Sequence, residues 1–225
     1  KYGALVWSGD IKSSFPSMKN QVAAGLNMGI AGIPWWTTDI GGFFGANIND
    51  PEFHELLIRW FEYGCFCPVM RLHGYRWPLQ PQYGTTGGAT CVSGAPNEVW
   101  SYTDQVCEIL SDYLRLRERM LPYITELMEE AHEKGTPVMR PLFYDFPEDK
   151  ESWNVETEYM FGPKVLVKPI TDADARETDV YLPGGASWTN AWTGETFDGG
   201  QTVHVAAPIE QIPLFTRDGY KLPVK

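Results

Sequence analysis

Short apolar runs and stretches of helical period take turns along the first 96 residues. The apolar runs cover residues 4–7, 32–36 and 68–73, and each predicts a short strand that is buried on both faces. Helical spacing follows the first two runs, over residues 14–28 and 50–65. The pattern therefore predicts strand–loop–helix units at a spacing of about 30 residues, which is typical of parallel strands joined by helices.

Local signals indicate where the first two helices begin. Ser14 or Ser17 can cap the first helix, because a hydroxyl oxygen accepts from the free N–H groups of the first turn. Asp50 is the expected cap of the second helix, with Pro51 in its first turn and Glu52 beside the positive end of the helix dipole.

The remainder of the chain changes from one long helical stretch to strands. The helix is predicted over residues 97–134, with a kink or break at Pro122 and an end at Gly135. The β-rich segments that follow, separated by glycine turns, are 138–143, 159–170, 178–182, 187–192 and 202–206. Short strands with such turns predict an antiparallel sandwich.

Composition excludes several classes of protein. The 225 residues carry 18 Lys+Arg and 29 Asp+Glu, a net charge of −11, and 43% of them are hydrophobic. This balance argues against a disordered chain and against a surface for nucleic acid or anionic lipid. No apolar run approaches the roughly 20 residues that a spanning helix needs. Three arginines, Arg115, Arg117 and Arg119, are expected to pair with acids on a helix surface.

The sequence gives no sign of a metal or cofactor. A single residue separates Cys65 from Cys67, and this spacing does not suit a zinc site. The four cysteines are predicted to be buried free thiols. The chain contains no HExxH motif, no paired CxxC motif and no phosphate-binding loop. We therefore expect no cofactor and no metal.

Polar side chains follow each predicted strand. Asp10 follows the first strand and Asp39 the second, while Arg71 and His73 share one face of the third. In open α/β sheets and in (β/α)8 barrels, binding and catalytic residues gather at the carboxyl ends of the strands. We expect these side chains to lie together.

Each of these residues also has a structural interpretation. Asp10 is either a general acid beside aromatic rings or the cap of the next helix. Asp39 follows two tryptophans, which fits a subsite where rings stack on a sugar, or else a loop aspartate beside core tryptophans. Arg71 and His73 either bind hydroxyl groups and a carboxylate or form a structural ion pair.

Several motifs, taken in order, resemble glycoside hydrolase family 31. They are Trp7-Ser8-Gly9-Asp10, the GIPWWTTDIGGF sequence of residues 32–43, Met70-Arg71-Leu72-His73-Gly74, and shorter matches within 113–117, 121–123, 137–142 and 181–194. The resemblance extends over almost the whole chain. This family comprises retaining α-glucosidases and α-xylosidases, with some transglycosylases and α-glucan lyases.

The resemblance implies an α/β fold, the C-terminal portion of a (β/α)8 TIM barrel followed by an antiparallel β-sandwich domain. Residues 1–135 would supply barrel strands 6–8 with their helices, and residues 136–225 the sandwich. The resemblance also implies that Asp10 is the general acid/base. The implied substrate-binding residues are Trp7, Trp36, Asp39, Phe43, Arg71 and His73.

The family's nucleophilic aspartate belongs to an earlier barrel strand, so we expect a fragment of a retaining exo-acting α-glycosidase. Its expected partner is an oligosaccharide that ends in α-linked xylose or glucose, with no nucleic acid and no membrane. The motif form favours α-xylosidase. A non-catalytic carbohydrate-binding relative and an α-glucan lyase or transglycosylase on the same scaffold are the alternatives. Oligomeric state is open, and bacterial cytoplasm and periplasm both fit.

Overall fold

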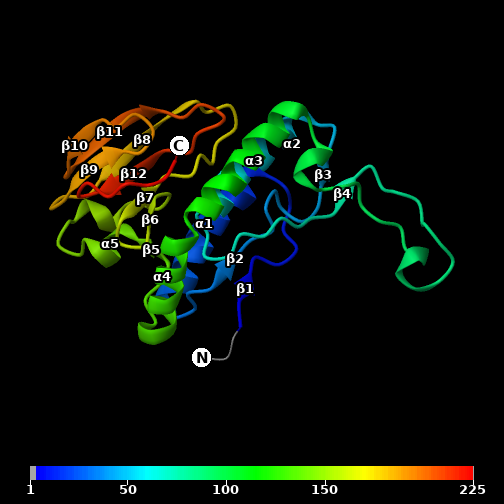
Figure 1. Cartoon of the computed structure of the whole chain (residues 1–225), viewed down its shortest axis with the longest axis horizontal. Helices are drawn as coiled ribbons and strands as arrows, with labels where there is room; N and C mark the ends of the chain where they lie inside the picture. The colour runs from blue at the N-terminus through cyan, green and yellow to red at the C-terminus, as the bar shows by residue number, and fades with distance from the viewer. Residues whose placement is uncertain (1–3, 225) are drawn as a thin grey trace.

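The computed structural model describes residues 4–224, which form a helical first part and a strand-rich second part (Figure 1). The first part contains β1 (Val6–Trp7), α1 (Phe15–Ile30), β2 (Trp36–Thr37), β3 (Ala46–Asn47), α2 (Pro51–Cys65), β4 (Arg76–Trp77), the 3-10 turns η1 (Gly87–Thr90) and η2 (Val99–Ser101), α3 (Asp104–Arg119) and α4 (Leu121–Lys134). Helices α1 to α3 lie between the short parallel strands and the second part (Figure 1). Within residues 4–224, no helix is long and apolar enough to cross a bilayer.

The first two strand–helix units are confirmed. Strands β1 and β2 pair in parallel, with Val6 opposite Trp36. The side chain of Ser14 caps α1 by accepting from Ser17 N, and the side chain of Asp50 caps α2 by accepting from Glu52 N. The caps therefore act where the sequence places them.

The third expected strand, over residues 68–73, is not formed. The segment lies alongside β2 in space. Val69 N donates to Trp36 O at 3.1 Å, and Thr37 Oγ1 donates to Val69 O at 2.8 Å. A side-chain hydroxyl thus takes the place of a backbone donor, and Pro68 has no N–H to give. The result is an extended segment without a regular ladder. Beyond it, Arg76 and Trp77 form β4, parallel to β3, in a stretch where no apolar run predicts a strand.

The long helical stretch is two helices. Gly135 ends α4 with a φ of 74°, as expected. The break falls at Met120, so that Pro122 occupies the first turn of α4, where it needs no N–H partner. The helix begins later than predicted, and residues 97–103 lie outside it. The side chain of Thr103 caps α3 by accepting from Val106 N, so that Asp104 is the first helical residue.

Within residues 4–224, one of the three arginines that were expected to pair with acids on the helix surface does so, while Arg119 donates to a backbone carbonyl, that of Pro223. Arg115 pairs with Asp112 at 2.7 Å on the exposed face of α3, as expected. Arg117 instead points inward and donates to three carbonyls after α2, those of Cys65, Cys67 and Pro68, at 2.7–2.8 Å. The Arg117 side chain leaves α3 on the side that faces the end of α2 rather than solvent.

The second part is an antiparallel sandwich, as expected. Its elements are β5 (Met139–Pro141), α5 (Leu142–Asp145), the 3-10 turn η3 (Glu151–Trp153), β6 (Tyr159–Phe161), β7 (Val165–Val167), β8 (Glu177–Leu182), β9 (Ser187–Asn190), β10 (Thr196–Asp198), β11 (Gln201–Ala206) and β12 (Leu214–Arg217). A six-stranded sheet in the order β10-β9-β12-β7-β6-β5 stands beside the pair β11-β8. Buried residues of both, among them Met160, Leu166, Val180 and Val203, make a shared core. The sequence pattern missed β10 and β12.

Two of the cysteines are buried free thiols, Cys65 and Cys67, as predicted. Burial raises the pKa of each thiol to about 12. Cys91 is exposed in the loop after β4 and contradicts the prediction, since that loop projects away from the rest of the molecule (Figure 1).

Arg59 of α2 joins the two parts. Its guanidinium is fully buried and donates to the carbonyls of Ala175 at 3.0 Å and Ala207 at 2.7 Å, in two loops of the sandwich. It also pairs with Glu62 at 3.1 Å. Tyr113 Oη of α3 donates to the other oxygen of Glu62 and accepts from Ile212 N. Helices α2 and α3 thereby hold the sandwich through a network of buried hydrogen bonds, in which Arg59 Nε alone among these side-chain atoms has no partner within residues 4–224.

Glu62 should make the stability of the protein depend on pH. Burial raises the pKa of its carboxyl from 4.5 to about 8, against the opposing charge of Arg59. Between these values the folded state holds one more proton than the unfolded state, so the free energy of unfolding falls by about 1.4 kcal/mol per pH unit as pH rises. Urea unfolding at a series of pH values from roughly 5.5 to 7 should show that the free energy of unfolding falls with pH less steeply in Glu62→Gln, by about this amount. Parallel slopes for the two proteins would contradict it.

Candidate active site

Hydrogen bonds join the segments that follow β1 and β2. Thr38 Oγ1 and Asp39 N both lie 3.4 Å from Ser8 Oγ, to which each donates. Farther along, Phe43 N donates to Ile11 O at 2.7 Å. Because β1 and β2 are parallel, both strands end at one edge. Residues 8–11 therefore lie against residues 38–43.

The segment after α2 lies on the other side of this loop. Ile40 N donates to Arg71 O at 3.2 Å, and Tyr75 N donates to Phe43 O at 2.6 Å. The rings of Phe43 and His73 are 5.6 Å apart. Arg71 and His73 are therefore brought to the same edge as Asp39, as expected from their place after the third apolar run.

Asp39 is the most constrained residue of the group. Its side chain is 0% exposed, and Oδ1 accepts from Arg71 Nη1. Oδ2 is buried and has no hydrogen-bond partner among residues 4–224. Burial raises the pKa of this carboxyl, while the charges of Arg71 and His73 oppose the shift. A buried acceptor that lacks a donor costs about 1–3 kcal/mol, so Oδ2 needs a donor that residues 4–224 do not supply in this arrangement.

Asp10 and Trp7 lie at the solvent side of the same edge. The Asp10 side chain is exposed, and its charge is one of the causes that raise the pKa of Asp39. Trp7 is 50% exposed and pairs with Thr37, so the two side chains share a face. The exposed Asp10 carboxyl thus lies close enough to the buried Asp39 carboxyl to act on its pKa, and the exposed Trp7 indole ends strand β1.

Trp36 does not join the group. It is only 3% exposed and packs on α1, where a Cβ added to Gly25 would lie 2.8 Å from the indole ring. Trp36 is the register partner of Val6, so it faces away from Trp7. Its place in the helix-facing core does not fit the substrate contact expected of it.

Arg76 is a positioning residue that the sequence did not indicate. Its guanidinium is fully buried and donates to Gly42 O at 2.7 Å, Ile40 O at 3.0 Å and Asn97 Oδ1 at 3.0 Å. It also lies 4.9 Å from the centre of the Phe53 ring. These contacts hold the loop that carries Asp39. In the sequence, the single signal for this role is that Arg76 stands between two aromatic residues.

Two glycines let the loop come this close. Gly41 and Gly42 have φ values of 85° and 74°, which side chains rarely adopt. A Cβ on Gly42 would lie 2.6 Å from Ser13 Cα. The Gly-Gly pair is therefore needed for the contact between the two strand-end segments.

The chemistry of this group suits a polar, uncharged ligand with several hydroxyls. Carboxylate oxygens of Asp10 and Asp39 accept, Arg71 donates, and His73 does either. Among residues 4–224, no cluster of three or more His, Cys, Asp or Glu side chains has the arrangement to hold a metal ion.

Family models match nearly all of the chain. The model described as "Glycosyl hydrolases family 31 TIM-barrel domain" matches residues 1–127. The model described as "Glycosyl hydrolase family 31 C-terminal domain" matches residues 135–222.

Individual relatives agree with the family models. An alpha-xylosidase of Saccharolobus solfataricus is 37% identical over 100% of this chain and 28% of its own length. Neutral alpha-glucosidase C of Mus musculus is 34% identical over 100% of this chain and 23% of its own. The crystal structure of a GH31 alpha-xylosidase from a soil metagenome, complexed with xylose, is 53% identical with a TM-score of 0.94, over 98% of this chain and 33% of that one. The chain thus spans about a quarter to a third of the length of these relatives.

Replacing Gly42 with alanine should destabilise the strand-end loop. The new Cβ meets the Ser13 backbone, which cannot swing away, and the left-handed φ adds a cost of about 1–2 kcal/mol. Gly45→Ala is the matched control, since its φ is 85° but its nearest neighbour is Lys12 Cγ at 3.7 Å. Urea unfolding should show a clearly larger loss for Gly42→Ala. Equal losses would mean that the close approach to Ser13 does not matter.

Proposed function

Because the chain belongs to glycoside hydrolase family 31, we propose that its strand-end group is part of the active site of a retaining exo-acting α-glycosidase. The substrate would be an oligosaccharide that ends in α-linked xylose. The observation that carries the proposal is the buried Asp39 carboxylate, of which Arg71 holds one oxygen while the other has no donor among residues 4–224. A sugar hydroxyl supplies the donor that this oxygen needs.

In this proposal Asp10 is the general acid/base. Its exposed carboxyl gives a proton to the glycosidic oxygen as that bond breaks, and later takes a proton from the water that releases the sugar. Retention requires a second carboxylate, about 5–5.5 Å from the first, that attacks the anomeric carbon. We assign that nucleophile to an earlier barrel strand of a longer polypeptide, since this chain spans only 28% and 23% of the length of two relatives.

The remaining residues would hold the sugar. Trp7, half exposed on the face opposite to Trp36, offers an indole face for the ring. Arg71 and His73 offer donors to the hydroxyl groups, and Phe43 supports the His73 ring from 5.6 Å. Xylose is the preferred unit because the chain is 53% identical to an alpha-xylosidase whose structure contains xylose.

We also propose that the domain boundary lies between residues 135 and 136, where Gly135 ends α4. Residues 1–135 would then contribute barrel strands 6–8. An apolar groove of about 640 Å³ runs beside the extended segment Pro68–Leu72, with Leu114, Ile124 and Met128 among its lining residues. The earlier barrel elements of the longer polypeptide would cover this groove and complete the barrel.

Activity assays on the full-length enzyme test the proposal directly. With p-nitrophenyl α-xyloside and p-nitrophenyl α-glucoside as substrates, kcat/KM should be higher for the xyloside. Proton NMR spectra recorded within the first turnovers should show that the released xylose has the α configuration. Turnover of neither substrate would overturn the proposed activity, and release of β-xylose would overturn the retaining mechanism.

The role of Asp10 predicts a dependence on the leaving group. Asp10→Asn should lower kcat/KM for an α-xylosyl disaccharide by about 10²–10⁴-fold, because its leaving alkoxide needs the proton. The same variant should lose far less on the nitrophenyl substrate, whose leaving group departs unprotonated. Asp198→Asn, at an exposed strand end of the sandwich, should leave both unchanged. Equal losses on the two substrates would rule out acid catalysis by Asp10.

A further inference from the structure

A second cavity lies between α3 and the sandwich, away from the strand-end group. It has a volume of about 360 Å³ and is lined by Asp112, Tyr113, Leu116, Arg119, Trp192, Glu210, Gln211 and Val224. Its size is within the roughly 300–1,000 Å³ of pockets that hold small molecules. None of its lining residues belongs to the group around Asp39.

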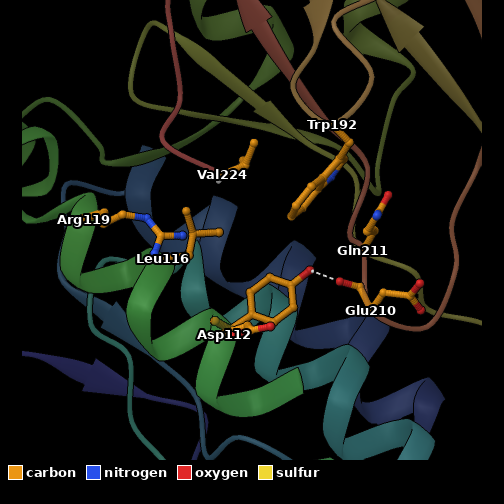
Figure 2. A pocket seen from close by; sticks show the side chains of 8 residues that line it. Asp112, Leu116, Arg119, Trp192, Glu210, Gln211 and Val224 are labelled. Carbon is orange, nitrogen blue, oxygen red and sulfur yellow. Dashed lines mark hydrogen bonds between the residues drawn. The ribbon is translucent and has the colours of Figure 1, made fainter. Parts of the chain in front are cut away.

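An aromatic ring projects into this cavity. Figure 2 shows the indole of Trp192 reaching from the sandwich toward α3, with Arg119 and Leu116 on one side and Glu210 and Gln211 on the other. The indole Nε1 donates to Ile212 O at 2.7 Å, which fixes the ring. Trp192 therefore offers a preorganised apolar face without a free polar atom of its own.

Polar groups surround that face. Asp112, Leu116 and Arg119 are spaced so that they share one side of α3, and Glu210 and Gln211 face them from the loop before β12. Arg119 Nε donates to Pro223 O at 2.9 Å, and its two terminal nitrogens make no hydrogen bond to any residue within 4–224. The Tyr113 hydroxyl closes the floor, bonded to Glu62, Glu210 O and Ile212 N.

We propose that this cavity is a second, non-catalytic binding site for a neutral pyranose unit of an oligosaccharide. An apolar ring face stacks on the C–H side of a sugar, while carboxylates, an amide and a guanidinium exchange hydrogen bonds with its hydroxyls. The choice of a saccharide as the ligand rests on the proposed function, but the binding does not depend on catalysis. The site would retain a longer substrate near the enzyme between cleavage events.

Calorimetric titration tests the site separately from turnover. In the full-length Asp10→Asn enzyme, which consumes the ligand only slowly, an oligosaccharide with terminal α-xylose should bind at two sites. Adding Trp192→Ala should weaken the second site by about tenfold or more. Adding Trp192→Phe should keep it within a few-fold, because an aromatic face remains.

Two further measurements separate binding from damage to the fold. Trp192→Ala in the otherwise unchanged enzyme should leave kcat/KM for nitrophenyl α-xyloside within about twofold while it raises KM for the oligosaccharide. Glu210→Ala, an exposed side chain whose backbone carbonyl keeps its bond to Tyr113, should weaken only the second site. One binding site in the Asp10→Asn enzyme, or two sites that Trp192→Ala leaves unaltered, would overturn the proposal. If the enzyme turned over no glycoside, the two-site titration would still decide it.

Discussion

Buried arginines that bind backbone carbonyls hold this structure together where regular ladders are short. Arg59 binds carbonyls of two sandwich loops, Arg76 those of the loop that carries Asp39, and Arg117 those of the turn after α2. A buried carbonyl without a donor carries a cost comparable to a lost hydrogen bond, so these contacts stabilise the loops that they join. A guanidinium suits this role because it presents five N–H groups in a fixed plane and keeps its charge.

The candidate site depends on the second of these contacts. Arg76 and the Gly41-Gly42 pair hold the loop against residues 8–13, and the loop in turn buries Asp39 beside Arg71. The position of Asp39 therefore depends on contacts that Arg76 and Ser13 make with the backbone of its loop. Asp10 and Trp7 remain exposed, which suits groups that meet a substrate. In the proposed function, the buried Asp39 carboxyl holds the sugar and the exposed Asp10 carboxyl transfers the proton.

Local signals predicted what depends on neighbours in sequence. The caps at Ser14 and Asp50, the helix end at Gly135 and the strand-end position of Asp39 all follow from a few adjacent residues. Contacts between distant segments were not accessible in this way. The sequence could not show that Arg59 and Arg76 are buried, nor that Trp36 faces α1 instead of a ligand. The sequence also predicted a strand over residues 68–73 that is not formed, because the Thr37 hydroxyl, rather than a backbone N–H, donates to Val69 O.

In the proposed function, Asp39 and Asp10 face one sugar at the edge where β1 and β2 end. A crystal structure of the full-length enzyme with xylose would show this arrangement. We expect a sugar hydroxyl oxygen about 2.6–3.0 Å from Asp39 Oδ2, with the Asp10 carboxyl on the side of the anomeric carbon. A structure in which a protein donor occupies Asp39 Oδ2, while xylose binds away from both carboxyls, would contradict it.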